Sequence, residues 1–313
     1  MSTQAEKLQR FAALTNRLGW DLCIEYDDQK PEFHQEGRVL SPVGITSTIA
    51  MLASGANLQD AEMLCQRIGI DGTEDLELVE TVLRELGGIP KSMAFLFLTA
   101  WFTNNKALLD SEYGAAIRKF RASIISQDKS KPTLASQIND WVKEEFPIFP
   151  HVMCSVEGSS NWHIFIGNVL NFTALSESEF DLAQTCKMPF ETDNWVEVDA
   201  LFKRGHAIKP MLENLGILLS GKLPDLGEGF QNLDEILHSV YFEVNEGGAA
   251  LPDQAGLSKV DDVDVSWKEL RLDEQFMFTV HNRELNIAVL MGFYNWAYIT
   301  GRQVQVIIVY ELE

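Results

Sequence analysis

Segments with helical spacing come mainly first in this chain, and strand-like segments come mainly last. A chain arranged in this way favours an α+β fold, in which helices and strands are segregated. The recurrence of apolar residues predicts helices over residues 5–19, 41–55, 58–68, 73–87, 110–120, 133–146 and 208–216. Apolar alternation and buried apolar runs predict strands over residues 92–103, 164–172, 196–202, 238–245, 276–280, 288–293 and 303–312.

Two helix ends carry recognisable signals. Ser41-Pro42 is typical of a helix start, because the first turn leaves unbonded the N–H group that proline lacks. Thr73 is predicted to cap the helix that Gly87 and Gly88 end. The chain has 313 residues, and no repeat, linker or low-complexity tract divides it, so we predict a single domain over residues 1–313.

The chain is strongly acidic. Lys plus Arg number 25 and Asp plus Glu number 46, which gives a formal net charge of −21. Such a chain is repelled by phosphate backbones and by anionic lipid, so we expect neither nucleic-acid nor membrane binding. The longest nearly uncharged apolar stretch, residues 93–102, is too short to span a bilayer.

The four cysteines, Cys23, Cys65, Cys154 and Cys186, are too widely separated for a metal knuckle or a redox pair. Their even number allows two disulfides, but their mostly apolar neighbours favour reduced, buried thiols. Residues 1–10 lack the apolar core of a signal peptide, so we expect a cytoplasmic protein. The glycosylation sequon that begins at Asn171 is then a chance match.

Motifs of catalysis are absent from the sequence. It has no nucleophile elbow, no zinc-protease motif, no phosphate-binding loop and no nucleotide fingerprint. The six histidines occur singly, so we expect no metal site and no cofactor. A catalytic triad drawn from distant positions is compatible with the sequence, but no motif points to one. We therefore expect a protein that is not an enzyme.

Residues 247–268 have little periodicity and many acidic residues. A structureless segment of this length inside a compact domain is usually functional or disordered. Because no other segment suggests a site, this loop is the predicted functional region.

Several short runs, taken in order, match the pattern of one family. They include Ser41 and Pro42, the run Ile138-Asn139-Asp140-Trp141-Val142, Asn168 with Phe172, the run from Met211 to Gly216, the run from His238 to Gly248, and the closing runs at 276–280 and 290–292. On these motifs the chain resembles the serpins over nearly its whole length. The runs at Ser41-Pro42 and Met211–Gly216 are also similar to poxvirus serpins.

The resemblance implies a fold with a large central mixed β-sheet, N-terminal helices packed on it, reduced secondary sheets and an exposed reactive-centre-like loop at 247–268. The sequence departs from the family at Gly37, Gly44 and Val169. A block of strands and helices is also missing, since only residues 173–207 join two segments that are far apart in other serpins. Beyond the usual family end, residues 301–313 are predicted to add a C-terminal strand that covers an exposed sheet edge.

In serpins a protease cuts the exposed loop, whose first half then inserts into the large sheet and traps the protease. The resemblance places the hinge of that loop at Glu246, Gly247, Gly248, Ala249, Ala250, Leu251, Pro252 and Asp253. It places the scissile bond near Asp262-Val263, with Lys259, Asp261, Asp262 and Val263 as the contact residues. An acidic bait residue implies a caspase or granzyme target, whereas Lys259 implies a trypsin-like one.

The hinge is poorly suited to insertion, because Leu251 is bulky, Pro252 lacks an N–H group and Asp253 is charged. We therefore predict a non-inhibitory serpin that binds a protein partner, either a protease or a basic protein. The alternative is a suicide-type protease inhibitor. The poxvirus similarity leaves a viral immune modulator and export without a signal peptide open.

Overall fold

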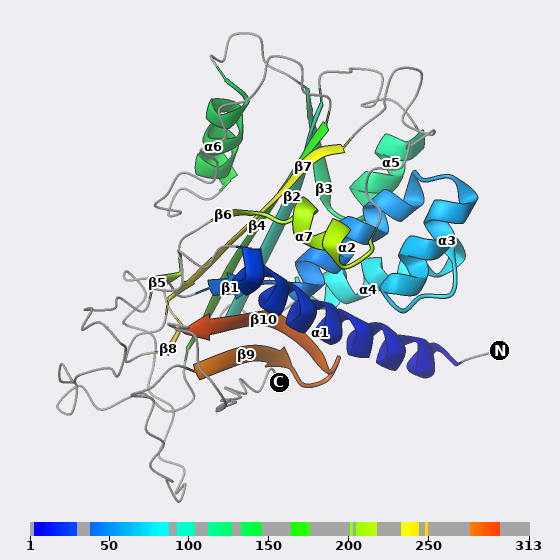
Figure 1. Ribbon diagram of the computed structural model, residues 1–313, viewed down its shortest axis with the longest axis horizontal. Helices are drawn as coiled ribbons and strands as arrows, with labels where there is room; N and C mark the ends of the chain where they lie inside the picture. The colour runs from blue at the N-terminus through cyan, green and yellow to red at the C-terminus, as the bar shows by residue number, and fades with distance from the viewer. Residues whose placement is uncertain are drawn as a thin grey trace, which may run out of the picture.

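The computed structural model describes residues 3–29, 38–87, 93–103, 112–126, 133–145, 164–175, 201–202, 205–217, 233–243, 248–249 and 276–294. In these ranges the chain forms an α+β fold with one large mixed sheet, one small sheet and helices packed on both (Figure 1). This is the predicted fold class. Among the described residues, no helix is both long and apolar enough to cross a membrane.

The helices match the predicted positions in order and type. They are α1 (Gln4–Gln29), α2 (Pro42–Ser54), α3 (Leu58–Arg67), α4 (Glu77–Leu86), α5 (Glu112–Lys119), α6 (Leu134–Glu145) and α7 (Lys209–Asn214). Ser41 is the N-cap of α2, and its side-chain oxygen accepts a hydrogen bond from the backbone N–H of Gly44. Gly216 ends the turn after α7 with a φ of 74°, a conformation that glycine adopts readily.

Two helix predictions are wrong in detail. Helix α1 continues ten residues beyond the predicted end, because Leu22 and Cys23 extend its buried face. Its Gly19 marks a close approach to Pro42 and not a helix end. Thr73 does not cap α4; it begins a short 3₁₀ turn, Thr73–Asp75, and α4 starts after Leu76 without a side-chain cap.

The large sheet has the strand order β3-β2-β4-β7-β5, with β6 also paired to β7 and β8 paired to β4. Its strands are β2 (Met93–Thr103), β3 (Ala122–Ser126), β4 (Ile164–Leu175), β5 (Leu201–Phe202), β6 (Gly205–Ala207), β7 (Leu233–Glu243) and β8 (Gly248–Ala249). The β2–β4 pair is antiparallel, whereas the β2–β3 and β4–β7 pairs are parallel. The small sheet is antiparallel and has the order β1 (Arg38–Leu40), β10 (Ile287–Tyr294), β9 (Phe276–Asn282).

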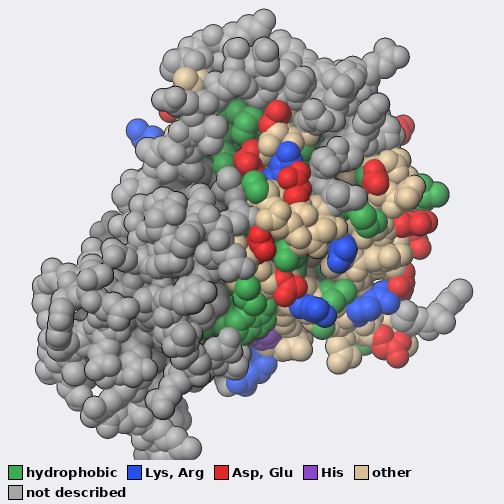
Figure 2. Space-filling model, viewed as in Figure 1, with side chains coloured by type: hydrophobic (Ala, Val, Ile, Leu, Met, Phe, Trp, Pro, Cys, Tyr) green, Lys and Arg blue, Asp and Glu red, His purple; other side chains and the backbone are tan. Residues whose placement is uncertain are grey.

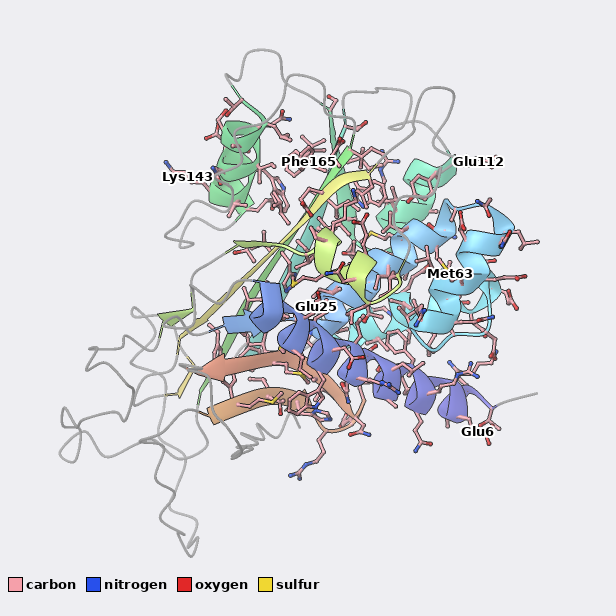
Figure 3. The ribbon with its side chains drawn as sticks, viewed as in Figure 1. Glu6, Glu25, Met63, Glu112, Lys143 and Phe165 are labelled. Carbon is pink, nitrogen blue, oxygen red and sulfur yellow. The ribbon has the colours of Figure 1, made fainter. Side chains whose placement is uncertain are left out.

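Different structural elements pack on the two faces of the large sheet. Of the described helices, α6 is the one that lies on one face (Figure 1), where its Trp141 packs edge-on against Phe102 with ring centroids 5.7 Å apart. Phe165 of β4 belongs to the same small core, and Lys143 lies on the exposed side of α6 (Figure 3). The opposite face contributes to the main core, which it shares with α1 to α5, α7 and the small sheet.

Strand predictions were less complete than helix predictions. Strands β1, β3, β6 and β8 were not predicted, and β7 begins at Leu233, five residues before its predicted start. Of the predicted strand at 196–202, only Leu201–Phe202 is described. The predicted strand at 303–312 lies outside the described residues. Short strands escape sequence analysis because two or three residues are too few to show alternation.

Candidate functional site at the seam of the large sheet

Strands β4 and β7 meet at a parallel seam inside the large sheet. These parallel strands pair from Ile164 with Leu233 up to Asn171 with Tyr241. Beyond Asn171, β4 continues to Leu175 without pairing to β7. The two strands therefore pair directly along their length and stop pairing at their C-terminal ends.

Strand β8 enters the sheet where this pairing stops. Ala249 pairs with Ala174 of β4 in an antiparallel register. The opposite edge of Ala174 is already paired with Met93 of β2, so β8 lies on the edge of β4 that faces β7. The chain therefore reverses direction after β7 and begins a new strand, β8, between the C-terminal ends of β4 and β7. We call this position between the two strands the insertion lane.

This placement corrects one prediction and leaves others outside the described chain. Gly248 and Ala249 form β8, so the prediction of an unbroken loop from residue 247 is wrong at these two positions. The other predicted hinge and contact residues lie outside the described residues; they are Glu246, Gly247, Ala250, Leu251, Pro252, Asp253, Lys259, Asp261, Asp262 and Val263.

The start of α2 is hydrogen-bonded to β7 beneath the seam. The backbone N–H of Ser41 donates to Nε2 of His238 over 2.9 Å, and both residues are fully buried. Because the N-terminal turn of a helix leaves its N–H groups without intrahelical partners, a buried helix start needs such an acceptor. His238 supplies it from the middle of β7.

The same turn of α2 is also bonded to β4. Nδ2 of Asn168 donates to the carbonyl oxygen of Gly44 over 3.0 Å and to Oγ1 of Thr48 over 2.6 Å. Asn168 and His238 are register partners across the seam. One helix turn is therefore attached to both strands at the same level, and separating β4 from β7 there strains these bonds.

Two titratable groups near the sheet have shifted pKa values. Burial raises the pKa of Glu235 on β7, and the backbone N–H groups of Ile236 and Lys209, both hydrogen-bonded to its Oε1, partly oppose the shift. Burial also raises the pKa of the Cys65 thiol to about 11. Cys23 and Cys65 are buried and neither belongs to a disulfide, in agreement with the buried thiols predicted for these two. Within the described ranges no group of three His, Cys, Asp or Glu residues could hold a metal ion.

The family model of the serpins, described as serine protease inhibitors, matches residues 13–206, more than half of the chain. The chain belongs to the serpin family. A comparison with curated protein sequences finds no match. The similarity to this family therefore rests on the family model and on solved structures.

Solved structures share the fold at low sequence identity. Human thyroxine-binding globulin with bound thyroxine is 13% identical, with a TM-score of 0.69 over 91% of this serpin and 98% of that chain. Serpin48 of the insect Tenebrio molitor is 15% identical, with a TM-score of 0.72 over 93% and 99%. Tengpin, a thermophilic serpin, is 16% identical, with a TM-score of 0.69 over 91% and 94%.

Six of the seven predicted family residues fall into two places in this serpin. Ser41, Pro42, Asn168 and His238 meet below the seam, where the ring of Pro42 also packs beside Gly19 of α1. Trp141 and the half-buried Asn139 lie on α6 across the sheet.

Phe172 of β4 lies in the main core of this serpin, with its ring centroid 6.3 Å from that of Phe242 on β7. Thr48 was missed by sequence analysis. A signal existed, because Thr48 is a polar residue four positions after Gly44 in a helix without charged residues.

Proposed function

We propose that this serpin acts by binding a protein partner through residues 253–268 and does not inhibit proteases by loop insertion. The observation that carries the proposal is the register of β8 on β4. Ala249 lies opposite Ala174, so in a strand that continues along this lane each next residue faces the preceding residue of β4. The register therefore assigns a neighbour to every residue that insertion would bring into the sheet.

Continuing the register places Asp253 opposite Leu170. Residues directly opposite each other in an antiparallel pair point to the same face, and Leu170 points into the main core. Its partner across the seam is Val240, and both side chains are fully buried. Insertion would therefore place a carboxylate between two buried aliphatic residues, where it remains costly or must take up a proton.

The same register places Leu251 opposite Phe172. That position already holds the contact between Phe172 and Phe242, whose centroids lie 6.3 Å apart. A leucine entering here must displace aromatic rings in a packed core, and such overpacking costs about 1–3 kcal/mol. A small side chain would enter this position at lower cost.

Pro252 falls opposite Asn171, between these two residues. A strand inserted between β4 and β7 is hydrogen-bonded on both edges, so every N–H group is needed, and proline has none. A carbonyl left buried and unpaired costs about 1–3 kcal/mol. The three unfavourable residues are consecutive, so insertion should stall just beyond β8.

The alternative function, a suicide-type inhibitor cut near Asp262-Val263, is favoured by one observation. Strand β8 already occupies the first two positions of the insertion lane. An inserting loop would have only to extend this strand. The serpin-fold relatives nevertheless include thyroxine-binding globulin complexed with thyroxine, so the fold also carries proteins named for binding.

The deciding experiment nicks the loop with a nonspecific protease and compares thermal unfolding before and after. We expect an unchanged or lower Tm, because the cut loop does not insert. We also expect no detergent-stable complex after incubation with caspase-like, granzyme-like and trypsin-like proteases. A nicked protein that becomes much more heat-resistant, or any covalent protease complex, would support the inhibitor instead.

The partner surface is proposed to be the acidic part of the loop. On the face shown in Figure 2, acidic side chains are interspersed with basic ones. Some described acidic residues are paired, since Lys7 and Asp75 form an ion pair with an N–O distance of 2.7 Å. The loop, by contrast, concentrates Asp261, Asp262 and Asp264. Such a cluster suits a basic partner and speeds its association at low salt.

A pull-down from cytosolic lysate, with a loop-deleted chain as control, would identify the partner. Changing Asp261, Asp262 and Asp264 to Asn should then slow association and weaken its salt dependence. A matched variant that loses three charges elsewhere, at the exposed Glu77, Glu144 and Glu145, should associate at nearly the normal rate. Equal effects of the two variants on the association rate would show that the interface lies outside the loop.

A further inference from the structure

The N-terminal end of the seam contains a bulge in β7. Ile164 of β4 pairs with Leu233, but the next residue, Phe165, pairs with Glu235. Asp234 is therefore an extra residue on β7, beside the end of β4 that Phe165 marks in Figure 3. Bulges occur mainly between antiparallel strands, where they redirect side chains, so a bulge in this parallel pair indicates a specific role.

Two consecutive carboxylates occupy the bulge. Asp234 and Glu235 are half-buried, and their neighbours Leu233 and Ile236 are buried. Burial raises the pKa of Glu235, so its surroundings disfavour the charged form. Carboxylates are tolerated at such positions when hydrogen-bond donors satisfy them, and each of these two has such donors.

Asp234 bonds β7 to the start of β4. Its Oδ2 accepts a hydrogen bond from the backbone N–H of Ile164 over 2.8 Å. Ile164 is the first residue of β4 and is buried in the main core. A hydrogen bond to an ionised acceptor is about twice as strong as one between neutral groups. The carboxylate therefore adds a strong bond across the seam at the level where the bulge interrupts the strand pairing.

Glu235 bonds the same bulge to α7. Its Oε1 accepts from the backbone N–H of Lys209, the first residue of α7, over 3.1 Å, and from that of Ile236 over 2.9 Å. The N–H of Ile208 donates to the carbonyl of Ile236 over 2.9 Å, so the carboxylate extends the pairing of β6 with β7 into the start of the helix. Nζ of Lys209 also donates to the carbonyl of Asp234 over 3.4 Å.

Helix α7 is itself attached to the N-terminal helices. Nδ2 of Asn214, its last residue, donates to Oε1 of Glu25 on α1 over 2.6 Å. Nη2 of Arg67 on α3 donates to the carbonyl of Gly216, just after α7, over 3.3 Å. A movement of this end of β7 is therefore resisted by β4 on one side and, through α7, by α1 and α3 on the other.

We propose that Asp234 and Glu235 form a latch that holds the N-terminal end of the seam closed and confines separation of β4 from β7 to the residues beyond the bulge. At their C-terminal ends the two strands already diverge, since β4 continues from Asn171 to Leu175 without pairing to β7. Separation would begin there and stop at the bulge. The latch acts within the sheet, so it does not depend on what binds the loop.

Residue-resolved hydrogen exchange of the full-length chain at several urea concentrations is the first test. Exchange of the Ile164 amide should depend steeply on urea, because only extensive unfolding releases it. Exchange in residues 169–171 should depend weakly on urea, as expected for a local opening that exposes little surface. A weak urea dependence at Ile164 would overturn the proposal, because it would show that this end of the seam also opens locally.

Variants of Asp234 provide the second test. Asp234→Ala removes the acceptor and should speed exchange of the Ile164 amide by about tenfold or more. Residues 169–171 should keep nearly their parental rates, because their local opening leaves the latch closed in both proteins. Asp234→Asn keeps a neutral acceptor and should have a smaller effect, about threefold, which also serves if the alanine variant does not fold. Glu144→Ala, at an exposed site on α6, should change neither rate.

Variants of Glu235 test whether the two carboxylates act together. Glu235→Ala should speed exchange of the Ile164 amide by about threefold or more, although the bonds of this carboxylate run to Lys209 and Ile236, because releasing α7 loosens the bulge. Glu235→Gln keeps an acceptor and should leave that rate nearly unchanged. Acceleration confined to the Lys209 and Ile236 amides would overturn the latch, as would an unchanged Ile164 rate in Asp234→Ala. Equal acceleration at Ile164 and at residues 169–171 would overturn it too, because it would show a loss of stability in the whole fold.

Discussion

The backbone N–H of Ser41 lies 2.9 Å from Nε2 of His238, and this hydrogen bond attaches the first turn of α2 to the middle of β7. The two residues are 197 positions apart in the sequence. Asn168 attaches the same turn to β4, so α2 bridges the seam through which a loop would have to enter. These polar contacts therefore add to the strand pairing and the apolar core that hold the seam closed.

Replacing His238 with Phe should destabilise the protein. The change removes the acceptor and leaves the N–H of Ser41 buried and unpaired, at a cost of about 1–3 kcal/mol in the free energy of unfolding. Urea denaturation measures the loss. His238→Gln, which keeps an acceptor of similar reach, should lose less, and equal losses in both variants would show that the hydrogen bond contributes little.

Removing the three unfavourable hinge residues should allow insertion. The variant Leu251→Ala, Pro252→Ala, Asp253→Ala presents small residues to Phe172, Asn171 and Leu170. After nicking, its Tm should rise by about 10 °C or more, since each kcal/mol gained raises the Tm of a domain this size by about 2 °C.

The control for this gain places alanines further along the loop, at Lys259, Asp261 and Val263. Nicking that variant should leave its Tm unchanged, as in the parent. If the first variant also fails to gain heat resistance after nicking, the three hinge residues are not what prevents insertion.

Glu235→Gln should change how stability depends on pH. Burial raises the pKa of Glu235 above its ordinary value of 4.5, so the folded state holds this proton more tightly than the unfolded state. The stability that this carboxyl contributes is full below pH 4.5 and is lost as the pH rises through the folded pKa. Glutamine can accept the same two backbone N–H groups without a charge, so the variant should not show this loss.

The measurement is the free energy of unfolding between pH 4 and 8 for the parent and for Glu235→Gln. As the pH rises above the ordinary carboxyl range, the free energy of unfolding of the variant should increasingly exceed that of the parent. Glu77→Gln, at an exposed site on α4, serves as the control. A difference that does not change with pH would show that Glu235 titrates normally.

Cys65 should be unreactive in the folded protein. Only the thiolate is nucleophilic, and burial raises the pKa of this thiol to about 11 while the side chain remains fully buried. At pH 8, iodoacetamide should leave Cys65 unlabelled until denaturant is added, as measured by peptide mapping. Rapid labelling of the native protein would contradict the buried position.

Gly19→Ala should destabilise the protein, although the same change stabilises most helices. A Cβ at Gly19 would lie 2.4 Å from Cγ of Pro42, and the proline ring cannot move aside easily. Moving α1 away from α2 should cost about 1–3 kcal/mol in the free energy of unfolding. An increase in stability would show that the two helices separate at little cost.

The local elements were determined by the sequence alone. The apolar stripes of α3 and α6, the Ser41-Pro42 start of α2 and the Gly216 turn after α7 depend on residues within one or two turns of each other. The order of helices and strands likewise indicated an α+β fold. Such signals are short-range, because backbone preference, capping and periodicity act between near neighbours in the chain.

The site was decided by the tertiary structure. Nothing near Asn168 shows that it lies opposite His238, because the register of two strands is set by which faces the core accepts. Helix α1 continues past Gly19 because Leu22 and Cys23 extend its buried face, and the glycine allows the close approach of Pro42; a glycine that ends a helix looks the same in sequence. Gly248 and Ala249 form a strand only because β4 leaves an unpaired edge beside them. A strand of two residues has too little sequence of its own to specify pairing, so its neighbour must do so.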